Sequence, residues 1–131
     1  MNILRALWRD SRGVGALEFA LSSGILLLLL VGMAQIGILA IANAGLQNAV
    51  GEGARLATIS PTPSDSTIIS RINAKRFGLI SSRITGPTIA HGTDNGTPYV
   101  DVTMSYSVPL NFVFFTTPAV TLTETRRAFT Y

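Results

Sequence analysis

The feature that most constrains this chain is a long gap in its charges, because no charged residue occurs between Glu18 and Glu52. Within the gap, residues 25–42 are apolar apart from Gln35, and they include the unbroken leucine run 26–30. An apolar stretch of about 18 or more residues is long enough for a helix that crosses the ~30 Å hydrocarbon core of a bilayer. The sequence therefore predicts one membrane-spanning helix near the N-terminus.

The charges around this run predict its orientation. Arg5, Arg9 and Arg12 precede the run, and the first arginine after it is Arg55. Because positive residues that flank a span stay on the cytoplasmic side, we expect a cytoplasmic N-terminus and an exported C-terminal part. The three arginines, with Asp10, supply +2 of the net charge of +3. With so little positive charge elsewhere, we expect no nucleic-acid partner.

A conventional signal peptide is the alternative to a permanent anchor. Ala42-Asn43-Ala44 has the small-x-small pattern of a signal peptidase site, and a basic leader is present. The apolar run, however, is longer than the roughly 7–15 residues of an ordinary signal-peptide core. Its length favours a helix that stays in the membrane.

The same helix is expected to continue beyond the bilayer. The next stop signal is Pro61, so the helix should run from about Val14 to about Ala57. Such a helix is ~65 Å long at 1.5 Å per residue, about twice the hydrocarbon thickness. Its second half carries a stripe of mostly small residues at helical spacing, which should pack on the exported part: Leu46, Ala49, Val50, Gly53, Ala54 and Ala57.

A second, short helix is predicted after the Pro61 to Ser64 turn. Ser64 or Asp65 can cap its N-terminus, and Gly78 is the expected stop. Three isoleucines form the expected inner face: Ile68, Ile69 and Ile72. Three basic residues form the expected outer face: Arg71, Lys75 and Arg76. A basic face of this kind is either solvated or meets acidic headgroups or a neighbouring subunit.

The remainder predicts three strands. Residues 100–108 alternate apolar and polar side chains, which is typical of a strand with one buried face. Residues 83–90 form a weaker strand that Gly86-Pro87 interrupts, so we expect it at an edge. Asn95-Gly96 is a turn signal between these two strands. Residues 119–129 form the third strand.

The inward face of the third strand is left open by the sequence, because Glu124-Thr-Arg-Arg breaks its alternation. The predicted fold class is nevertheless clear: α+β, with a long N-terminal transmembrane helix extending into a small exported domain that has a short helix and a roughly three-stranded antiparallel sheet. We expect three regions: a leader (1–13), the long helix (14–58) and the exported domain (59–131). A chain of 131 residues has room for one modest domain of this kind.

Residues that could carry chemistry are few. His91 is the only histidine and the chain has no cysteine, so neither a zinc site nor a histidine-based catalytic triad is expected. We expect His91 to lie in a loop. The sequence accordingly predicts no catalytic residues, no metal, no cofactor and no enzymatic activity.

An apolar segment, residues 109–115, interrupts the expected polar connection between the second and third strands. Its aromatic residues, Phe112, Phe114 and Phe115, are candidates for a contact site. One interpretation places the segment beneath the sheet against the first helix. The other is an exposed apolar patch that contacts a partner or the membrane.

Residues 12–19, Arg-Gly-Val-Gly-Ala-Leu-Glu-Phe, place Gly13 at the end of the leader and Glu18 at the start of the apolar run. A carboxylate beside a membrane span is costly, so it indicates a functional residue with a partner. A glycine followed five positions later by Glu18-Phe19 and a hydrophobic helix resembles the class III signal of type IV pilins. The resemblance implies that a prepilin peptidase cuts between Gly13 and Val14. Glu18 and Phe19 are then the residues that dock subunits.

Gly15 is a second candidate cleavage point. Cleavage there makes Glu18 the third residue of the mature protein instead of the fifth, which the signal disfavours.

Taken together, these segments resemble the TadE-like family. The resemblance rests on Gly13, on Glu18-Phe19, on the leucine run, on Glu-Gly-Ala-Arg at residues 52–55, and on the strand pair that ends in a threonine-rich strand. It implies a pseudopilin or minor pilin of the bacterial Tad (tight adherence, Flp pilus) machinery, which acts in pilus biogenesis, adhesion and biofilm formation. The implied partners are the prepilin peptidase, other pilin or pseudopilin subunits, the Tad assembly machinery and membrane lipid. The implied location is the bacterial inner membrane, with the C-terminal domain in the periplasm.

Two other functions remain open at this point. The chain could be a single-pass envelope binding protein that keeps its leader and uses its exported sheet to hold a partner. It could also be a pseudopilin of a type II secretion system, whose signal shares the spacing from Gly13 to Glu18. Cleavage after Gly13 separates the first of these from a pilus subunit.

Overall fold

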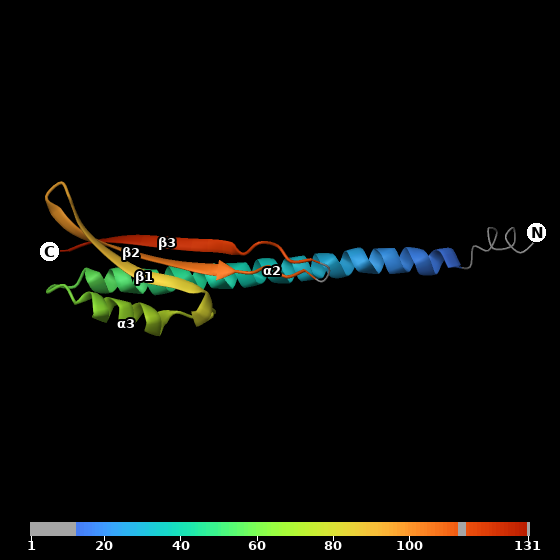
Figure 1. The fold of residues 1–131 in the computed structure, drawn as a ribbon, viewed down its shortest axis with the longest axis horizontal. Helices are drawn as coiled ribbons and strands as arrows, with labels where there is room; N and C mark the ends of the chain where they lie inside the picture. The colour runs from blue at the N-terminus through green and yellow to red at the C-terminus, as the bar shows by residue number, and fades with distance from the viewer. Residues whose placement is uncertain (1–12, 113–114, 131) are drawn as a thin grey trace, which may run out of the picture.

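The computed structural model describes residues 13–112 and 115–130 (Figure 1). A long helix, α2 (Val14–Ala57), carries a small domain on its C-terminal half. The domain contains a second helix, α3 (Asp65–Lys75), a short 3-10 turn, η2 (Ser81–Arg83), and one three-stranded sheet. This is the α+β fold that the sequence predicts. The part of the predicted leader before Gly13 lies outside the described residues.

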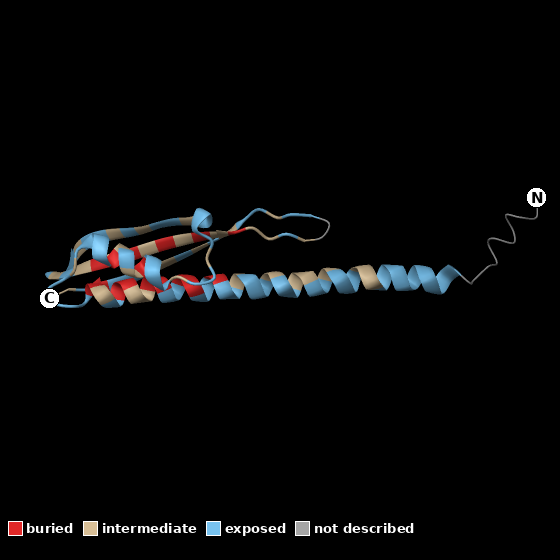
Figure 2. Ribbon diagram, turned by 90° about the horizontal axis from the view of Figure 1, so that it is seen from below, coloured by how far each residue is buried: buried red, intermediate tan, exposed pale blue. Residues whose placement is uncertain are grey.

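The bounds of α2 agree with the prediction. Gly13 is the N-cap residue, and Thr58 is the C-cap residue, whose N–H donates to the Leu56 carbonyl. The two halves of the helix differ in burial: buried positions begin only at Ala42, and the N-terminal half is largely exposed (Figure 2). The predicted stripe is confirmed, since all six of its members are buried, with Ala42 and Gly45 extending it toward the N-terminus.

The sheet has the order β1-β2-β3, with both pairs antiparallel: β1 (Ile84–Asp94), β2 (Thr97–Val108) and β3 (Val120–Phe129). The alternation predicted for the central strand is confirmed, because every second residue of β2 from Val100 onward is buried: Val100, Val102, Met104, Tyr106 and Val108. Their side chains face the helices and form most of the sheet's share of the core.

The hairpin between β1 and β2 is tighter than predicted. Asn95 and Gly96 both have positive φ values, 49° and 82°, as a two-residue type I′ turn requires. Strand pairing therefore continues up to Asp94 opposite Thr97. The prediction that His91 lies in a loop is wrong, because this turn keeps His91 within β1, opposite Val100.

The structure tests the edge position predicted for β1 and shows which face of β3 points inward. β1 lies at an edge, as expected, and its pairing shifts between Thr85 and Thr88, where Gly86-Pro87 interrupts the strand. In β3 the face toward the helices is the one that carries Leu122 and the buried Ala128. The intervening Glu124 side chain is only 18% exposed and accepts a 2.6 Å hydrogen bond from Arg126.

Helix α3 begins as predicted and ends early. The Ser64 hydroxyl accepts a 3.4 Å hydrogen bond from the Thr67 N–H, which makes Ser64 the N-cap residue. Ile68 and Ile72 are fully buried. The helix ends at Lys75, three residues before Gly78, and Gly78 has a φ of 65° that reverses the chain toward η2.

The domain has two layers, a sheet and a pair of helices that cover one of its faces. α2 packs on β2 and β3, and α3 packs on α2 and on β1 (Figure 1). Glycine permits the closest of these contacts, because a Cβ atom at Gly53 would collide with the Ile72 side chain. The opposite face of the sheet is polar, and hydroxyl pairs such as Thr103 with Thr125 bridge its strands.

Candidate functional site

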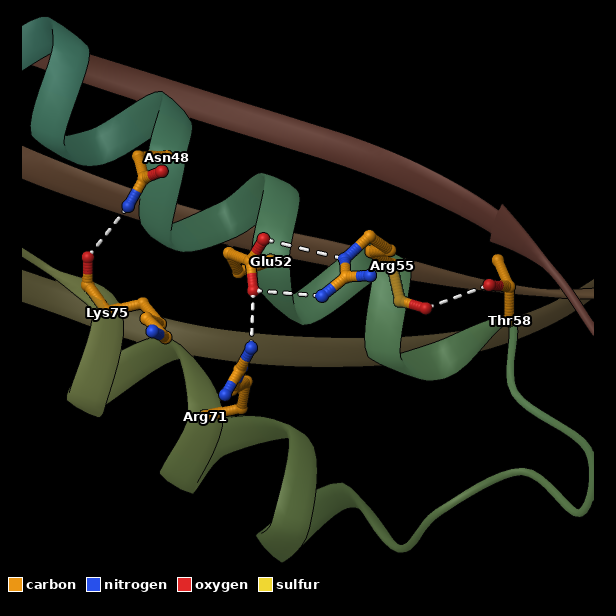
Figure 3. A network of polar contacts seen from close by, with 6 residues as sticks. All are labelled: Asn48, Glu52, Arg55, Thr58, Arg71 and Lys75. Carbon is orange, nitrogen blue, oxygen red and sulfur yellow. Dashed lines mark hydrogen bonds and ion pairs between the residues drawn. The ribbon is translucent and has the colours of Figure 1, made fainter.

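The Glu-Gly-Ala-Arg segment lies on the C-terminal half of α2, where α3 crosses it (Figure 3). An oxygen of Glu52 accepts a 2.7 Å hydrogen bond from Arg71 of α3. The i,i+3 contact of Glu52 with Arg55 on the same helix is longer, at 3.5 Å. The hydrogen bond from Arg71 holds the pKa of Glu52 below its ordinary value of 4.5, desolvation opposes this shift, and Arg55 adds to it. Glu52 therefore joins two helices.

Two further contacts surround this ion pair. The Asn48 side chain donates a 2.9 Å hydrogen bond to the Lys75 carbonyl, which is one of the free carbonyls at the C-terminus of α3. Gly53 lies directly under Ile72. The placement of Arg71 on an outer solvent face is therefore wrong: α3 turns its side chain toward α2, where the carboxylate of Glu52 is available. This segment fixes α3 onto α2.

The predicted cleavage residues lie at the start of α2. Gly13 is the N-cap and Val14 is the first residue of the helix. A Cβ atom built on Gly13 or on Gly15 meets no atom within 4 Å, so the described structure leaves the backbone at this point open.

The predicted docking residues follow one turn later. Glu18 lies four positions after Val14 and therefore on the same side of the helix. Phe19 is 74% exposed. No ion pair joins Glu18 to another residue within 13–112 or 115–130. The structure thus places Gly13, Val14, Glu18 and Phe19 together on the first turns of one exposed helix, well away from the domain.

The candidate contact site is described at residues 109–112 and 115. Leu110 and Phe112 lie against α2, as one of the two interpretations held, but beyond the end of the sheet. The Gln35 side chain donates a 2.7 Å hydrogen bond to the Asn111 carbonyl. Phe112 and Phe115 stack with ring centres 4.8 Å apart. Phe115 is 52% exposed. Phe114, the third predicted contact residue, lies outside the described residues.

An apolar hollow of about 270 Å³ opens where this segment meets α2. Six of the described residues line it: Gly32, Gln35, Ile36, Leu39, Leu110 and Phe112. In the sequence, Gln35 is the one polar interruption of the apolar run, and no role was predicted for it. The signal was the interruption itself, since a polar side chain inside a membrane span indicates a specific partner.

A polar cluster on the outer face of the sheet was also missed. Arg127 of β3 donates two hydrogen bonds to Asp101 of β2, at 2.8 and 2.9 Å, and covers the Tyr99 ring at 3.7 Å. The guanidinium of Arg127 holds the pKa of Asp101 below its ordinary value. Only the strand register brings Asp101 opposite Arg127, and the sequence did not predict that register.

This architecture defines a class of protein: a small α+β domain built on one long helix whose free half is apolar enough to cross a membrane. The most apolar part of α2 has a mean hydropathy of 2.7 over 18 residues and is 6% buried, which fits a single-pass membrane anchor. Within this class, residues 13–55 match the family described as TadE-like protein. The match begins at the predicted cleavage glycine and ends at the arginine of Glu-Gly-Ala-Arg, so it confirms the resemblance over this segment.

The match indicates a minor-pilin-like protein of a Tad pilus system, and such proteins associate with pilus subunits and with the Tad machinery. It covers about a third of the chain and leaves the sheet outside it. Comparisons with curated proteins and with solved structures gave no match.

Proposed function

We propose that the chain is a pseudopilin or minor pilin subunit of a Tad/Flp pilus system. A prepilin peptidase cuts it between Gly13 and Val14 at the cytoplasmic face of the bacterial inner membrane. The mature chain stays anchored by α2, with its domain in the periplasm, until the assembly machinery takes it up. One observation carries this proposal: the TadE-like match coincides with a single helix that starts at Val14, presents Glu18 one turn later, and supports the domain on its far half.

In this proposal the two halves of α2 have different roles. The N-terminal half is exposed in the described structure, so its apolar side chains are available to lipid or to the helices of other subunits. Cleavage gives Val14 a free α-amino group one turn from Glu18. The carboxylate of Glu18 needs a cation beside a membrane span, and the amine of a neighbouring subunit's Val14 supplies one. The C-terminal half has its stripe covered by its own domain.

Processing is the first test. We expect the dominant species in membrane extracts to begin at Val14. Gly13→Val should block cleavage, since a branched side chain crowds the backbone that the peptidase must reach. Gly15→Val is the matched control, because Gly15 is equally open and lies on the other side of the predicted bond. Intact-mass spectrometry identifies the N-terminus of the wild type and of the Gly13→Val and Gly15→Val variants.

A wild-type protein that keeps Met1 would contradict the processing and would favour the unprocessed envelope binding protein. A species that begins at Gly45 would favour a conventional signal peptide. Cleavage at Gly45 would also remove Ala42 from the core of the domain. The described structure therefore supports an anchor that is retained.

A further inference from the structure

The segment that joins α3 to β1, residues 75–83, lies at the end of the domain that faces the exposed half of α2 (Figure 1). Helix α3 runs back along α2 toward that half, and η2 follows it. The segment contacts α2 closely at two points. A Cβ atom at Gly45 would collide with the Phe77 carbonyl, and one at Gly78 would crowd the Ile41 side chain. The segment is therefore held at the level of Ile41 to Gly45.

This level is close to the end of the span on the domain's side. A hydrocarbon core of ~30 Å takes about 20 residues of a helix at 1.5 Å per residue. Counted from Val14 the core ends near Ala34, and counted from Glu18 it ends near Ile38. Ile41 to Gly45 then lie about 5–15 Å beyond the hydrocarbon. This interval covers the headgroup layer and about one Debye length of the water next to it.

Three basic residues lie in this segment: Lys75, Arg76 and Arg83. Arg76 donates a 3.2 Å hydrogen bond to the Ser81 hydroxyl, which brings its guanidinium to η2, the turn that ends at Arg83. Among residues 13–112 and 115–130, no ion pair involves any of the three. The nearest acidic residues in the sequence, Asp65 and Asp94, are the first residue of α3 and the last of β1, so both lie at the opposite ends of these elements. The end of the domain nearest the span therefore carries a net positive charge.

Apolar side chains lie between these charges. Phe77 and Ile80 are each 51% exposed. The Ile80 N–H donates to the Tyr106 hydroxyl at 3.3 Å, and the Ile80 carbonyl accepts a 3.0 Å hydrogen bond from the Arg83 N–H, so the sheet and η2 fix the shape of the segment. Basic side chains interspersed with exposed apolar ones are typical of surfaces that bind at a membrane interface. The segment thus combines the composition of such a surface with a position next to the span.

We propose that residues 75–83 bind the phosphates of anionic phospholipids in the leaflet that faces the domain, through Lys75, Arg76 and Arg83. The inference rests on the membrane anchor of the proposed function, because the segment meets this leaflet only if α2 spans the bilayer. The attraction of each basic residue to an anionic leaflet decays within a Debye length, so the distance from the span decides whether it acts. The contact gives the domain a second attachment to the membrane, and this attachment depends on lipid charge.

Fluorescence quenching by spin-labelled headgroups tests this contact. The full-length chain is given a single tryptophan by combining Trp8→Phe with Phe77→Trp. It is reconstituted into vesicles of phosphatidylcholine alone or mixed with phosphatidylglycerol, with the same small share of headgroup-labelled phosphatidylcholine in both. We expect severalfold stronger quenching at position 77 in the anionic vesicles. The difference should vanish at about 1 M salt, where the Debye length is about 3 Å.

A second reporter, Phe129→Trp in place of Phe77→Trp, is the matched control for position. Phe129 is a comparably exposed phenylalanine at the C-terminal end of β3, which lies at the far end of the domain from the span (Figure 1). Its quenching should be weak and equal in the two kinds of vesicle. Equal enhancement at positions 77 and 129 would overturn a contact made by residues 75–83.

The role of charge is tested in the chain that carries the reporter at position 77. Replacing Lys75, Arg76 and Arg83 together by glutamine should remove the enhancement by anionic lipid. Arg76→Lys with Arg83→Lys should retain most of it, because the positive charges remain. Arg55→Gln is the matched control and should change nothing, since Arg55 is an exposed arginine near the C-terminal end of α2. Enhancement that survives the triple glutamine variant overturns the proposal.

A third reporter, Leu27→Trp, tests the anchor separately, and lipids brominated near the chain end should quench it. Quenching at position 27, with no effect of anionic lipid at position 77, overturns the headgroup contact and leaves the anchor standing. Absence of quenching at position 27 overturns the anchor and the contact with it. Headgroup quenching at position 77 that falls as the protein-to-lipid ratio rises, in neutral and anionic vesicles alike, identifies a neighbouring copy of the chain as the occupant. That result also overturns the headgroup contact.

Discussion

At the scale of single residues, the two carboxylates singled out by the sequence have different uses. Glu18 has no ion-pair partner among the described residues, whereas Glu52 is held by Arg71 at 2.7 Å. Arg55, the weaker partner of Glu52, lies three positions along the same helix, and a neighbour at that spacing can be read directly from the sequence. Arg71 comes from another helix, and its side chain reaches Glu52 only through the particular crossing of α3 over α2. Long-range partners of this kind require the packing to be known.

The ion pair at Glu52 predicts how stability depends on pH. The pKa of Glu52 is lowered from 4.5 in the folded chain, so its contribution to stability is present above that value and is lost as pH falls through the lowered pKa. Asp101, whose pKa is lowered from 3.8, acts in the same direction. In detergent, the melting temperature of the full-length chain should therefore fall on acidification below about pH 4.5.

The matched variant is Glu52→Gln. It should melt lower than the wild type at pH 7, where the ion pair with Arg71 is fully formed, and the difference should shrink toward pH 3. Calorimetric scans across this range measure both curves. A constant difference between the two proteins at every pH would show that the charge of Glu52 does not stabilise the domain.

At the scale of elements, the sequence predicted the regular features and missed those that depend on context. The bounds of α2 and the buried face of β2 follow from local patterns, a charge gap and an alternation, which tertiary contacts did not override. The position of His91 was missed because a type I′ turn extends pairing farther than the weak pattern of β1 indicates. His91 in fact contacts Asp65 at the start of α3, at 2.9 Å. In the candidate site, the sequence predicts that one helix carries Gly13, Val14, Glu18 and Phe19. It does not predict that the connection between β2 and β3 lies beyond the end of the sheet.

The contact between α2 and α3 yields a prediction from two neighbouring glycines. Gly53→Ala should destabilise the domain, because its Cβ collides with Ile72, and overpacking of this kind costs about 1–3 kcal/mol. The gain in helix propensity, about 1 kcal/mol, offsets only part of this cost. Gly51→Ala meets no atom within 4 Å and should be more stable than the wild type by the propensity alone.

Melting temperatures of these two variants in detergent should therefore move in opposite directions. If both variants gained stability, α3 would not pack against α2 at Gly53. If both lost stability, the glycines would be needed for a reason other than this contact.

At the scale of the whole molecule, the proposed function depends on contacts between copies. Glu18→Gln keeps the size of the side chain and removes its charge, so it tests the pairing with a neighbour's α-amino group. Cleavage after Gly13 and insertion into the membrane should be normal. Removing one partner of a desolvated ion pair costs about 3–5 kcal/mol, so the yield of crosslinked or assembled subunits should fall by more than about tenfold.

Quantitative crosslinking of membrane fractions measures this loss, with Glu52→Gln as the comparison, since Glu52 is already paired within its own chain. If the Glu18→Gln variant assembled at the wild-type level, Glu18 would have no docking role. Its carboxylate would then only be favoured by the helix N-terminus, an effect below about 1 kcal/mol.

The continuity of α2 also determines how mechanical force would pass through an assembled subunit. The helix runs without a break from Val14 to Ala57, and its last turns form part of the same core as the sheet. No flexible linker separates the domain from the membrane segment, so tension applied to the domain would be transmitted directly into the span. Extraction from the bilayer and retraction into it would then move the subunit as one stiff rod, and the domain could not stretch away to absorb the pull.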